Sequence, residues 1–289
     1  MENSNFIANT VHEIRTPVQT IIGTLELLSD TKLNTEQTEY VRQIRFGADV
    51  LLTLVNDILD FSKIHSNSFS LENIPYDVVS LTEQTAYLES IEAFNKNIEL
   101  VTDIDYSIPP LVMGDPTRVK QILLNIIKNA IKFTSDGYIH VELSSKHKNM
   151  LLFQITDTGI GIPTDKIDKI FSSYYQADTS TSRKYGGTGL GLAICKALIA
   201  AMNGEIGVKP NPYGGSIFWF TIPLVPAENP EVKEFELPVP ATTHILIVED
   251  SMLSIRSLQN KLNTLGLQYI DFVTNSHEAI LSMQYAAKL

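Results

Sequence analysis

Cysteine is almost absent from this sequence. One cysteine, Cys195, occurs among 289 residues, which excludes an internal disulfide framework and a metal site built from several thiolates. Cys195 lies within the apolar segment LGLAICKALIAAM, where a thiol usually packs as a small hydrophobic group. We therefore predict a helix with a buried cysteine here and a chain suited to a reducing compartment.

Long apolar runs and an excess of positive charge are also missing. Lys196 interrupts the segment above, which is shorter than the ~18 residues of a membrane-spanning helix. The N-terminal MENSNFIAN lacks the basic start and apolar stretch of a signal peptide. With 22 Lys and Arg against 33 Asp and Glu, the net charge of −11 argues against a nucleic-acid interface. We predict a cytoplasmic chain without a membrane segment, although a longer parent protein could carry an anchor elsewhere.

Two apolar stripes run along residues 1–66. In both stripes the spacing alternates between four and three residues, which is typical of coiled-coil helices. Between them, Asn34 or Thr35 with downstream Glu and Gln offers helix-capping groups. A hairpin of two such helices cannot enclose a core alone, so we predict a dimeric four-helix bundle. The stripes consist of Ile7, Val11, Ile14, Val18, Ile21, Leu25 and Leu28, and of Val41, Ile44, Ala48, Leu51, Val55 and Ile58.

The pattern changes to mixed helices and strands over residues 72–224, which predicts an α/β sandwich. VKQILLNIIKNAIKF predicts a helix, and YIHVELSS, MLLFQITD and GSIFWFTIPL predict strands. Residues 225–243 hold four prolines among glutamates, which indicates a stiff, solvated linker. Residues 244–289 then open with the apolar run Ile245–Val248, which suits a parallel strand buried on both faces of a doubly wound α/β domain.

His12, Glu13 and Thr16 fall on the outward side of the first predicted helix when its apolar stripe faces the seam. A core histidine is therefore disfavoured, whereas an ordinary surface histidine stays open on this helix alone. Pro17 removes a helix hydrogen bond one turn back, near Glu13, at a cost of ~3 kcal/mol. We interpret Pro17 as loosening the helix beside His12.

The segment FIANTVHEIRTPV resembles the H-box of the sensor histidine kinases in a long and specific match. The resemblance implies that His12 attacks the γ-phosphate of ATP through Nε2, while Glu13 holds the proton of the other ring nitrogen. A neutral imidazole has one nucleophilic nitrogen, and a carboxylate on the opposite N–H fixes the tautomer. Thr16 matches a polar residue that orients water for dephosphorylating the partner in related kinases.

A polar stripe interrupts the predicted helix of the second region. A solvated face is the ordinary explanation, but NIIKNAIKFT resembles the N-box of the same family. The resemblance implies that Asn129, and secondarily Asn125, bind Mg²⁺ with ATP through amide oxygens, and that Lys132 meets phosphate. Mg²⁺ prefers such hard oxygen ligands. The stripe consists of Asp115, Arg118, Gln121, Asn125 and Asn129.

Glycine-rich segments follow the predicted strand that ends at Asp157. DTGIGIP alone could be a turn, but it resembles the G1 box, in which Asp157 accepts from the adenine amine and Gly159 and Gly161 let the backbone approach the base. IFSSYYQADTSTSRKYGGTGLGLAI resembles the F-box, lid and G2 box, whose glycines give backbone access to phosphate at a helix start. The further nucleotide-binding residues implied are Tyr175, Gly187, Thr188, Gly189, Leu190 and Gly191.

The implied fold is the Bergerat-type ATP pocket shared with gyrase and Hsp90-like ATPases, and neither the P-loop nor the protein-kinase spacing fits. Two departures from the family pattern affect the expected lid. Ser172 and Ser173 stand where many relatives carry an acidic residue and proline, and Ile217 stands where many carry threonine.

Glu249 and Asp250 follow the apolar run of the third region, at the carboxyl end of a strand, where open α/β sheets bind ligands. Ordinary loop carboxylates are the alternative, but the pair resembles the Mg²⁺-binding acidic pair of a receiver domain. Residues 244–289 would stop before the receiver's third strand, so we predict a truncated receiver that is poorly ordered or takes contacts from elsewhere. With the YYQ sequence at 174–176, the closest resemblance is to the aerobic-respiration-control type of hybrid sensor kinase.

These resemblances predict a homodimeric, ATP- and Mg²⁺-dependent protein histidine kinase of a two-component system. It would phosphorylate His12 and pass the phosphoryl group to a receiver aspartate of a response regulator, with phosphatase activity towards that partner as a further option. Two alternatives stay open: an ATP-hydrolysing clamp of the gyrase or Hsp90 kind, which would lack HEIRTP, and a non-catalytic dimeric scaffold.

Overall fold

A computed structural model of the chain describes residues 2–65, 70–146, 149–173, 175, 189–228, 240, 242–267 and 269–286. The chain divides into two compact units. The first unit comprises Met1–Leu71 and Asp168–Leu198, and the second comprises Glu72–Ile167 and Ile199–Leu289. No described helix is both long and apolar enough to cross a membrane.

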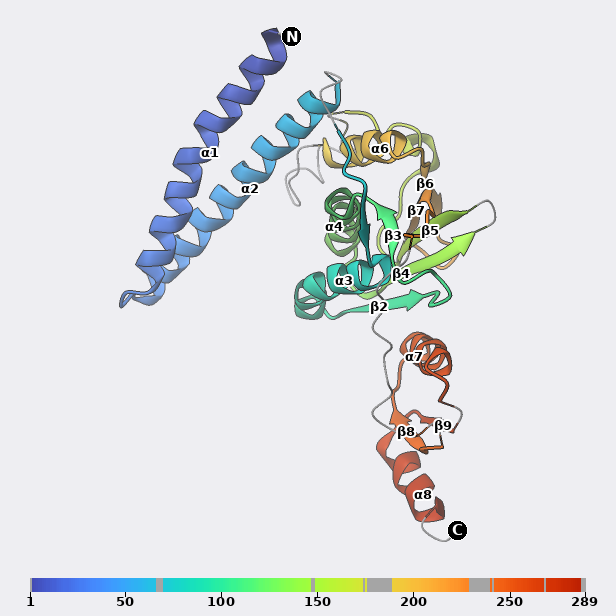
Figure 1. The fold of residues 1–289 in the computed structure, drawn as a ribbon. Helices are drawn as coiled ribbons and strands as arrows, with labels where there is room; N and C mark the ends of the chain where they lie inside the picture. The colour runs from blue at the N-terminus through green and yellow to red at the C-terminus, as the bar shows by residue number, and fades with distance from the viewer. Residues whose placement is uncertain are drawn as a thin grey trace. The chain divides into compact units, whose positions relative to one another are not determined.

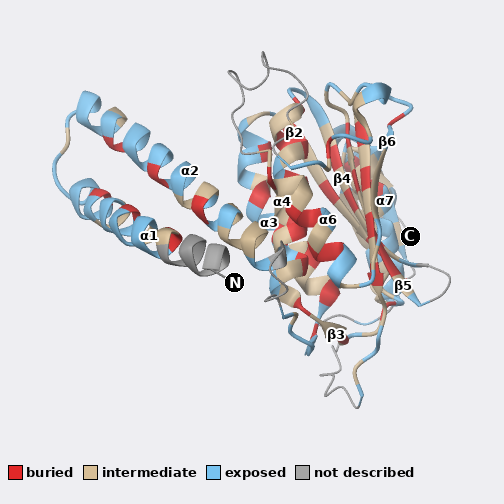
Figure 2. Ribbon diagram, turned by 90° about the horizontal axis from the view of Figure 1, so that it is seen from above, coloured by how far each residue is buried: buried red, intermediate tan, exposed pale blue. Residues whose placement is uncertain are grey.

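The first unit contains the predicted helical hairpin, formed by α1 (Glu2–Ser29) and α2 (Thr35–His65), which lie side by side (Figure 1). From Val11 onward, where the side chains are described, every second apolar position of each stripe is buried inside the hairpin, as the alternating bands of Figure 2 show. The buried positions are Val11, Val18 and Leu25 on α1 and Val41, Ala48 and Val55 on α2. The intervening apolar positions remain exposed.

Polar groups close and brace the hairpin. At the start of α2, Asn34 Oδ1 accepts from Gln37 N (2.8 Å) and Gln37 Oε1 accepts from Asn34 N (3.0 Å), which is a reciprocal capping box. Of the two predicted caps, Asn34 or Thr35, the structure has Asn34. Between the helices, Arg45 Nη2 contacts Glu26 Oε1 at 2.9 Å.

The helix predicted around Cys195 is α6 (Gly191–Ala201). Cys195 is fully buried, and burial raises the pKa of its thiol to about 12. The burial of Cys195 confirms the prediction of a packing thiol. A thiol with a raised pKa stays protonated and unreactive at neutral pH.

The second unit is built on a five-stranded sheet with the order β2-β4-β5-β7-β6. Only the β2–β4 pair is parallel, and the other three pairs are antiparallel. The strands are β2 (Ile98–Ile104), β4 (Gly137–Lys146), β5 (Met150–Asp157), β6 (Ile206–Pro210) and β7 (Ser216–Pro223). The three strands predicted from sequence are therefore β4, β5 and β7.

Two helices, α3 (Val78–Asn95) and α4 (Pro116–Phe133), cover one face of this sheet (Figure 1). The apolar face of α4 is buried together with alternate residues of β4 and β5 (Figure 2). Phe153 and Phe220 stack across neighbouring strands with ring centroids 4.4 Å apart. This packing fixes the ends of α4 and β5, where the predicted nucleotide residues lie.

A small ladder extends the second unit beyond its expected boundary. β1 (Ile74–Tyr76) pairs with β3 (Val112–Gly114), and Pro226 forms a bridge to Val112. Met113 N also donates to Val225 O at 2.8 Å. The predicted linker 225–243 is therefore wrong at its start, because backbone pairing holds residues 225–227 to the domain.

The third region forms β8 (Ile245–Val248), α7 (Met252–Thr264), β9 (Ile270–Val273) and α8 (Ser276–Ala286), with β8 parallel to β9. The prediction that β8 is buried on both faces is wrong, since Val248 is 52% exposed. Among the described residues β8 pairs with β9 alone, so the other edge of β8 has no neighbouring strand. α7 instead packs against β2, where Ser254 Oγ donates to Glu99 Oε1 at 2.8 Å.

Candidate phosphoacceptor and nucleotide sites

His12 lies on the exposed side of α1, together with Glu13 and Thr16. Val11 and Val18, each 3% exposed, anchor the opposite side of the helix in the hairpin. The three polar side chains therefore point away from the buried seam, as predicted. A solvent-facing imidazole with a neighbouring carboxylate is accessible to a reaction partner.

Pro17 leaves α1 continuous but removes one backbone donor, so the Glu13 carbonyl loses its usual partner four residues on. Threonine hydroxyls supply extra bonds on the same stretch: Thr16 Oγ1 donates to His12 O (3.2 Å) and Thr20 Oγ1 donates to Thr16 O (3.0 Å). Such bonds back to the preceding turn tend to bend a helix. The backbone around His12 thus departs from a regular ladder.

The polar stripe of α4 begins with a structural residue. Asp115 is the N-cap of α4, and its carboxylate accepts from Arg118 N and from Glu72 N, both at 3.0 Å. It is 5% exposed. Arg118 Nη1 donates to Gln121 Oε1 at 2.8 Å. The first half of the stripe thus stabilises the helix start.

Asn125, Asn129 and Lys132 occupy the second half of the stripe and are all half-buried. Asn129 Nδ2 donates to Asn125 Oδ1 at 3.4 Å, which leaves the amide oxygen of Asn129 as an acceptor for a cation. Lys132 Nζ lies 5.0 Å from the centroid of the Phe133 ring. Burial lowers the pKa of Lys132, because desolvation destabilises the charged ammonium group. An approaching anion would stabilise that charged form.

Asp157 ends β5 and is 4% exposed. Its Oδ1 accepts from Gly159 N at 2.9 Å, and its backbone carbonyl accepts from Asn211 Nδ2 at 3.0 Å. Burial raises the pKa of Asp157, and backbone N–H groups of Gly159 and Ser216 oppose that rise. This is a desolvated acceptor held in a fixed direction.

Glycines bring the Asp157 turn against the end of α4. A Cβ on Gly159 would lie 2.4 Å from Phe133 O, and a Cβ on Gly215 would lie 2.1 Å from Asp157 O. Gly161 and Gly215 also have positive φ angles of 70° and 89°, which side chains rarely tolerate. Close backbone approach therefore places Asp157 and Gly159 beside the helix end that carries Asn129 and Lys132.

The predicted lid and G2 residues are described in part. Gly187 and Thr188 lie outside the described residues. Gly189 has φ 68°, and Leu190 is 1% exposed, with its carbonyl accepting from Ile194 N at 2.9 Å at the start of α6. Tyr175 is half-buried. Gly189, Leu190 and Gly191 thus form the entry to a helix, as the G2 resemblance implies.

Glu249 and Asp250 follow β8 directly. Glu249 N donates to Val273 O (2.9 Å), and its Oε1 accepts from Ser251 N (3.1 Å). Glu249 is half-buried and Asp250 is exposed. The pair occupies the carboxyl end of the strand, as predicted, and its metal-binding role stays a prediction.

Three residues that hold the Asp157 turn were not predicted from the sequence: Asn211, Gly215 and Thr158. Thr158 Oγ1 accepts from Tyr138 N at 2.9 Å. The Gly214–Gly215 pair ahead of a strand was a readable turn signal. Asn211 and Thr158 act through long-range hydrogen bonds, which leave no periodic pattern in the sequence.

Two family models match the chain. The model described as His Kinase A (phospho-acceptor) domain matches residues 2–67, and the model described as Histidine kinase-, DNA gyrase B-, and HSP90-like ATPase matches residues 114–226. The chain belongs to the histidine kinase family. The exposed His12 lies within the region matched by the phospho-acceptor model, and Asp157 lies within the region matched by the ATPase model.

Relatives of this histidine kinase include hybrid and sensor proteins. It is 39% identical over 91% of its length to Hybrid signal transduction histidine kinase K of Dictyostelium discoideum, covering 23% of that protein. It is 38% identical over 98% of its length to Sensor protein GacS of Pseudomonas syringae pv. syringae, covering 31% of that protein. The kinase chain thus spans less than a third of these two relatives, and the aerobic-respiration-control subtype stays a prediction.

Solved structures agree with the fold. Full-length ShkA in complex with AMPPNP matches 96% of this chain with a TM-score of 0.74 and 31% identity, and the chain covers 57% of it. Histidine kinase ThkA in complex with response regulator protein TrrA matches 77% of this chain, with 62% of that chain covered, a TM-score of 0.52 and 26% identity.

Proposed function

We propose that this chain transfers the γ-phosphoryl group of ATP to His12 and then passes it to an aspartate of a response-regulator receiver domain. The observation that carries the proposal is the exposed His12–Glu13 pair on a hairpin, in a chain that also folds an ATPase domain with a desolvated Asp157 at its Gly-rich turn. A gyrase- or Hsp90-like clamp has no use for such a phospho-acceptor helix.

The nucleotide would be held by residues of both glycine segments and of α4. The buried Asp157 carboxylate suits the exocyclic amine of adenine, because Gly159 N fixes its direction and burial largely removes it from bulk solvent. The Asn129 amide oxygen, with Asn125 beside it, suits Mg²⁺ bound to ATP phosphates. Bound Mg²⁺ would neutralise phosphate charge. Lys132 and the backbone of 187–191 would meet the phosphates.

The chemical step forms a bond between His12 Nε2 and the γ-phosphorus and breaks the bond from that phosphorus to the bridging oxygen, releasing ADP. Glu13 would hold the Nδ1 proton and stabilise the positive charge that develops on the ring. The second transfer forms the bond from phosphorus to a receiver carboxylate oxygen and breaks the bond between phosphorus and His12 Nε2, so the imidazole leaves as neutral His12.

Dimerisation is the arrangement that the hairpin surface favours. The apolar positions left exposed alternate with the buried ones, so each helix presents a second apolar stripe to the outside. A second hairpin would cover these stripes and complete a four-helix bundle. The exposed positions are Ile14, Ile21 and Leu28 on α1 and Ile44, Leu51 and Ile58 on α2.

The partner is a receiver domain, either in another protein or in the remainder of a longer chain to which residues 244–289 belong. Hybrid relatives and a related kinase solved with a response regulator support this proposal. Thr16, exposed one turn from His12, would orient water to dephosphorylate that receiver. Thr16→Ala should slow partner dephosphorylation without slowing His12 labelling, and an unchanged dephosphorylation rate would remove this role.

Incubation with γ-labelled ATP tests the proposal. The chain should acquire acid-labile, protein-bound label, and His12→Ala should lose it while His277→Ala, which changes an exposed histidine of α8, keeps it. Free phosphate without protein-bound label would instead favour the clamp. Nucleotide binding with neither product would favour the scaffold.

A further inference from the structure

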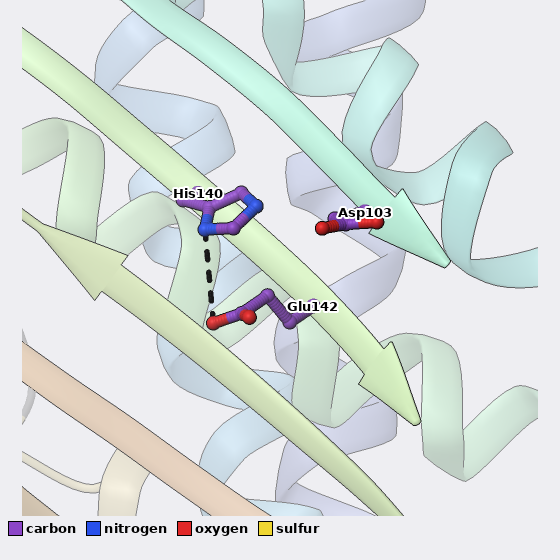
Figure 3. Close-up of side chains that lie close together, drawn as sticks. All are labelled: Asp103, His140 and Glu142. Atoms are coloured by element: carbon purple, nitrogen blue, oxygen red, sulfur yellow. Dashed lines mark ion pairs between the residues drawn. The ribbon is translucent and has the colours of Figure 1, made fainter. Parts of the chain in front are cut away.

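Three metal-ligating side chains meet on the parallel strand pair β2–β4. His140 and Glu142 are two residues apart on β4, so they share a face of the sheet. The register pairs Glu142 with Asp103 and His140 with Val101. One ligand atom from each of Asp103, His140 and Glu142 lies within 4.8 Å of the other two (Figure 3).

The strand pattern places this cluster on the face of the sheet opposite to the one that α3 and α4 cover. Ile139, Val141 and Leu143 alternate with the cluster residues on β4 and are at most 1% exposed. His140, Glu142 and Asp103 are half-buried. None of the three residues is assigned to nucleotide binding or to phosphotransfer, so a test of this site does not depend on the kinase proposal.

His140 is the member of the cluster that lacks a complete set of partners. Its Nδ1 lies 3.6 Å from Glu142 Oε2, and its side chain is 13% exposed. Its Nε2 is buried and has no hydrogen-bond partner among the described residues. Buried polar atoms are nearly always paired in native proteins, and an exception points to a bound water or ion. In Figure 3 both carboxylates lie beside the ring, with the Glu142 carboxylate next to one ring nitrogen and Asp103 on another side.

Amide groups already orient both carboxylates. Asn260 Nδ2 of α7 donates to Asp103 Oδ1 at 3.1 Å, and Gln154 Nε2 of β5 donates to Glu142 Oε2 at 3.3 Å. Such donors fix the direction of metal-ligating carboxylates in known sites. Burial lowers the pKa of His140, the Glu142 and Asp103 carboxylates oppose that shift, and the positive charge of Arg256 adds to it.

We propose that Asp103, His140 and Glu142 form a binding site for a divalent transition-metal cation of the zinc type. An imidazole nitrogen favours zinc over Mg²⁺ or Ca²⁺, which prefer all-oxygen sites. Zinc holds its ligands at roughly 2.0–2.2 Å, so the carboxylates must swing closer, which their broad terminal torsions allow. The bound cation would tie the edge strand β2 to β4.

Zinc titration of the full chain without nucleotide tests the site. The unmodified chain should bind Zn²⁺, and Asp103→Asn and Glu142→Gln should each weaken binding by more than about tenfold, because each keeps its shape but loses a charged ligand. Asp271→Asn and His277→Gln, both at exposed positions of the third region, should bind as the unmodified chain does.

Thermal unfolding supplies the second readout and separates binding from misfolding. Zinc should raise the Tm of the unmodified chain and of the two control variants, since it binds the folded state, but not the Tm of Glu142→Gln. Failure of the unmodified chain to bind zinc would overturn the proposal. Unchanged zinc affinity in both Asp103→Asn and Glu142→Gln would also overturn it, because the cation would then sit elsewhere.

Discussion

At the scale of single residues, Asp157 shows how burial tunes a binding group. Its carboxylate is desolvated, and burial raises its pKa above the ordinary aspartate value of 3.8. The ionised form offers two acceptor oxygens, whereas the protonated form turns one of them into a donor. The proposed binding of an adenine amine should therefore be favoured at neutral pH and weaken as pH falls through the raised pKa.

We predict that Asp157→Asn weakens ATP binding by roughly 10- to 100-fold, which corresponds to losing a hydrogen bond to a charged group worth about 1.5–3 kcal/mol. Calorimetric titration with ATP at several pH values measures this. The unmodified chain should lose affinity on acidification before an ordinary aspartate would titrate, and the variant should lack that pH dependence. Asp165→Asn, at an exposed position, is the matched control, and an equal effect there would contradict this role.

Gly215 and Gly214 allow a matched test of the close backbone approach at the Asp157 turn. Both have positive φ angles, 89° and 99°, but only at Gly215 would a Cβ meet backbone, at 2.1 Å from Asp157 O. Gly214→Ala should cost about 1–3 kcal/mol of unfolding free energy from φ strain alone, and Gly215→Ala should cost clearly more. Urea denaturation measures both, and equal losses would contradict the close approach.

At this scale the motif residues could be predicted from the sequence, whereas the residues that hold them in place could not. Asp157 and Gly159 follow a recognisable strand within a glycine-rich segment. Asn211, in contrast, reaches Asp157 across 54 positions of sequence, and no local pattern predicts such a bond. Asp115 was placed on the stripe, but its carboxylate caps α4 by accepting from Arg118 N and also accepts from the distant Glu72 N.

At the scale of elements, the hairpin stripes divide into two functions that sequence spacing alone does not separate. Val11, Val18 and Leu25 are buried within one hairpin, whereas Ile14, Ile21 and Leu28 are exposed. A heptad predicts an apolar stripe but not which half faces which neighbour. The structure makes that division, and it identifies the residues that a dimer would cover.

Ile21→Lys should therefore disrupt the dimer while leaving the hairpin folded. Ile21 is 44% exposed and lies on the outer stripe, whereas Leu27 is 72% exposed and lies off it. Sedimentation velocity at micromolar concentration should show monomer for Ile21→Lys and dimer for Leu27→Lys, with circular dichroism reporting the helix content of each. A monomeric unmodified chain would contradict the proposed bundle.

Long, strongly patterned elements of the ATPase domain were predictable, and short ones were not. α4, β4, β5 and β7 carry clear periodicity. β1 and β3 have three residues each, too few to show alternation. Pairing of residues 225–227 with this ladder depends on residues more than a hundred positions away, so composition alone suggested a linker.

At the scale of the whole molecule, the phospho-acceptor hairpin and the ATPase domain were predictable because both carry dense motifs. The third region was less so. Its order of strand, helix, strand and helix follows from the sequence, yet α7 packs on β2 of the ATPase domain through contacts such as Ser254 Oγ to Glu99 Oε1 at 2.8 Å. Such contacts between distant surfaces have no sequence signature.

The central claim is that His12 receives the phosphoryl group. Tandem mass spectrometry of the chain after incubation with ATP and Mg²⁺, with digestion kept at neutral pH to preserve phosphohistidine, locates that group directly. We predict phosphate on the imidazole of His12, and none on any histidine in His12→Ala. Phosphate on another residue with His12 unmodified would contradict it.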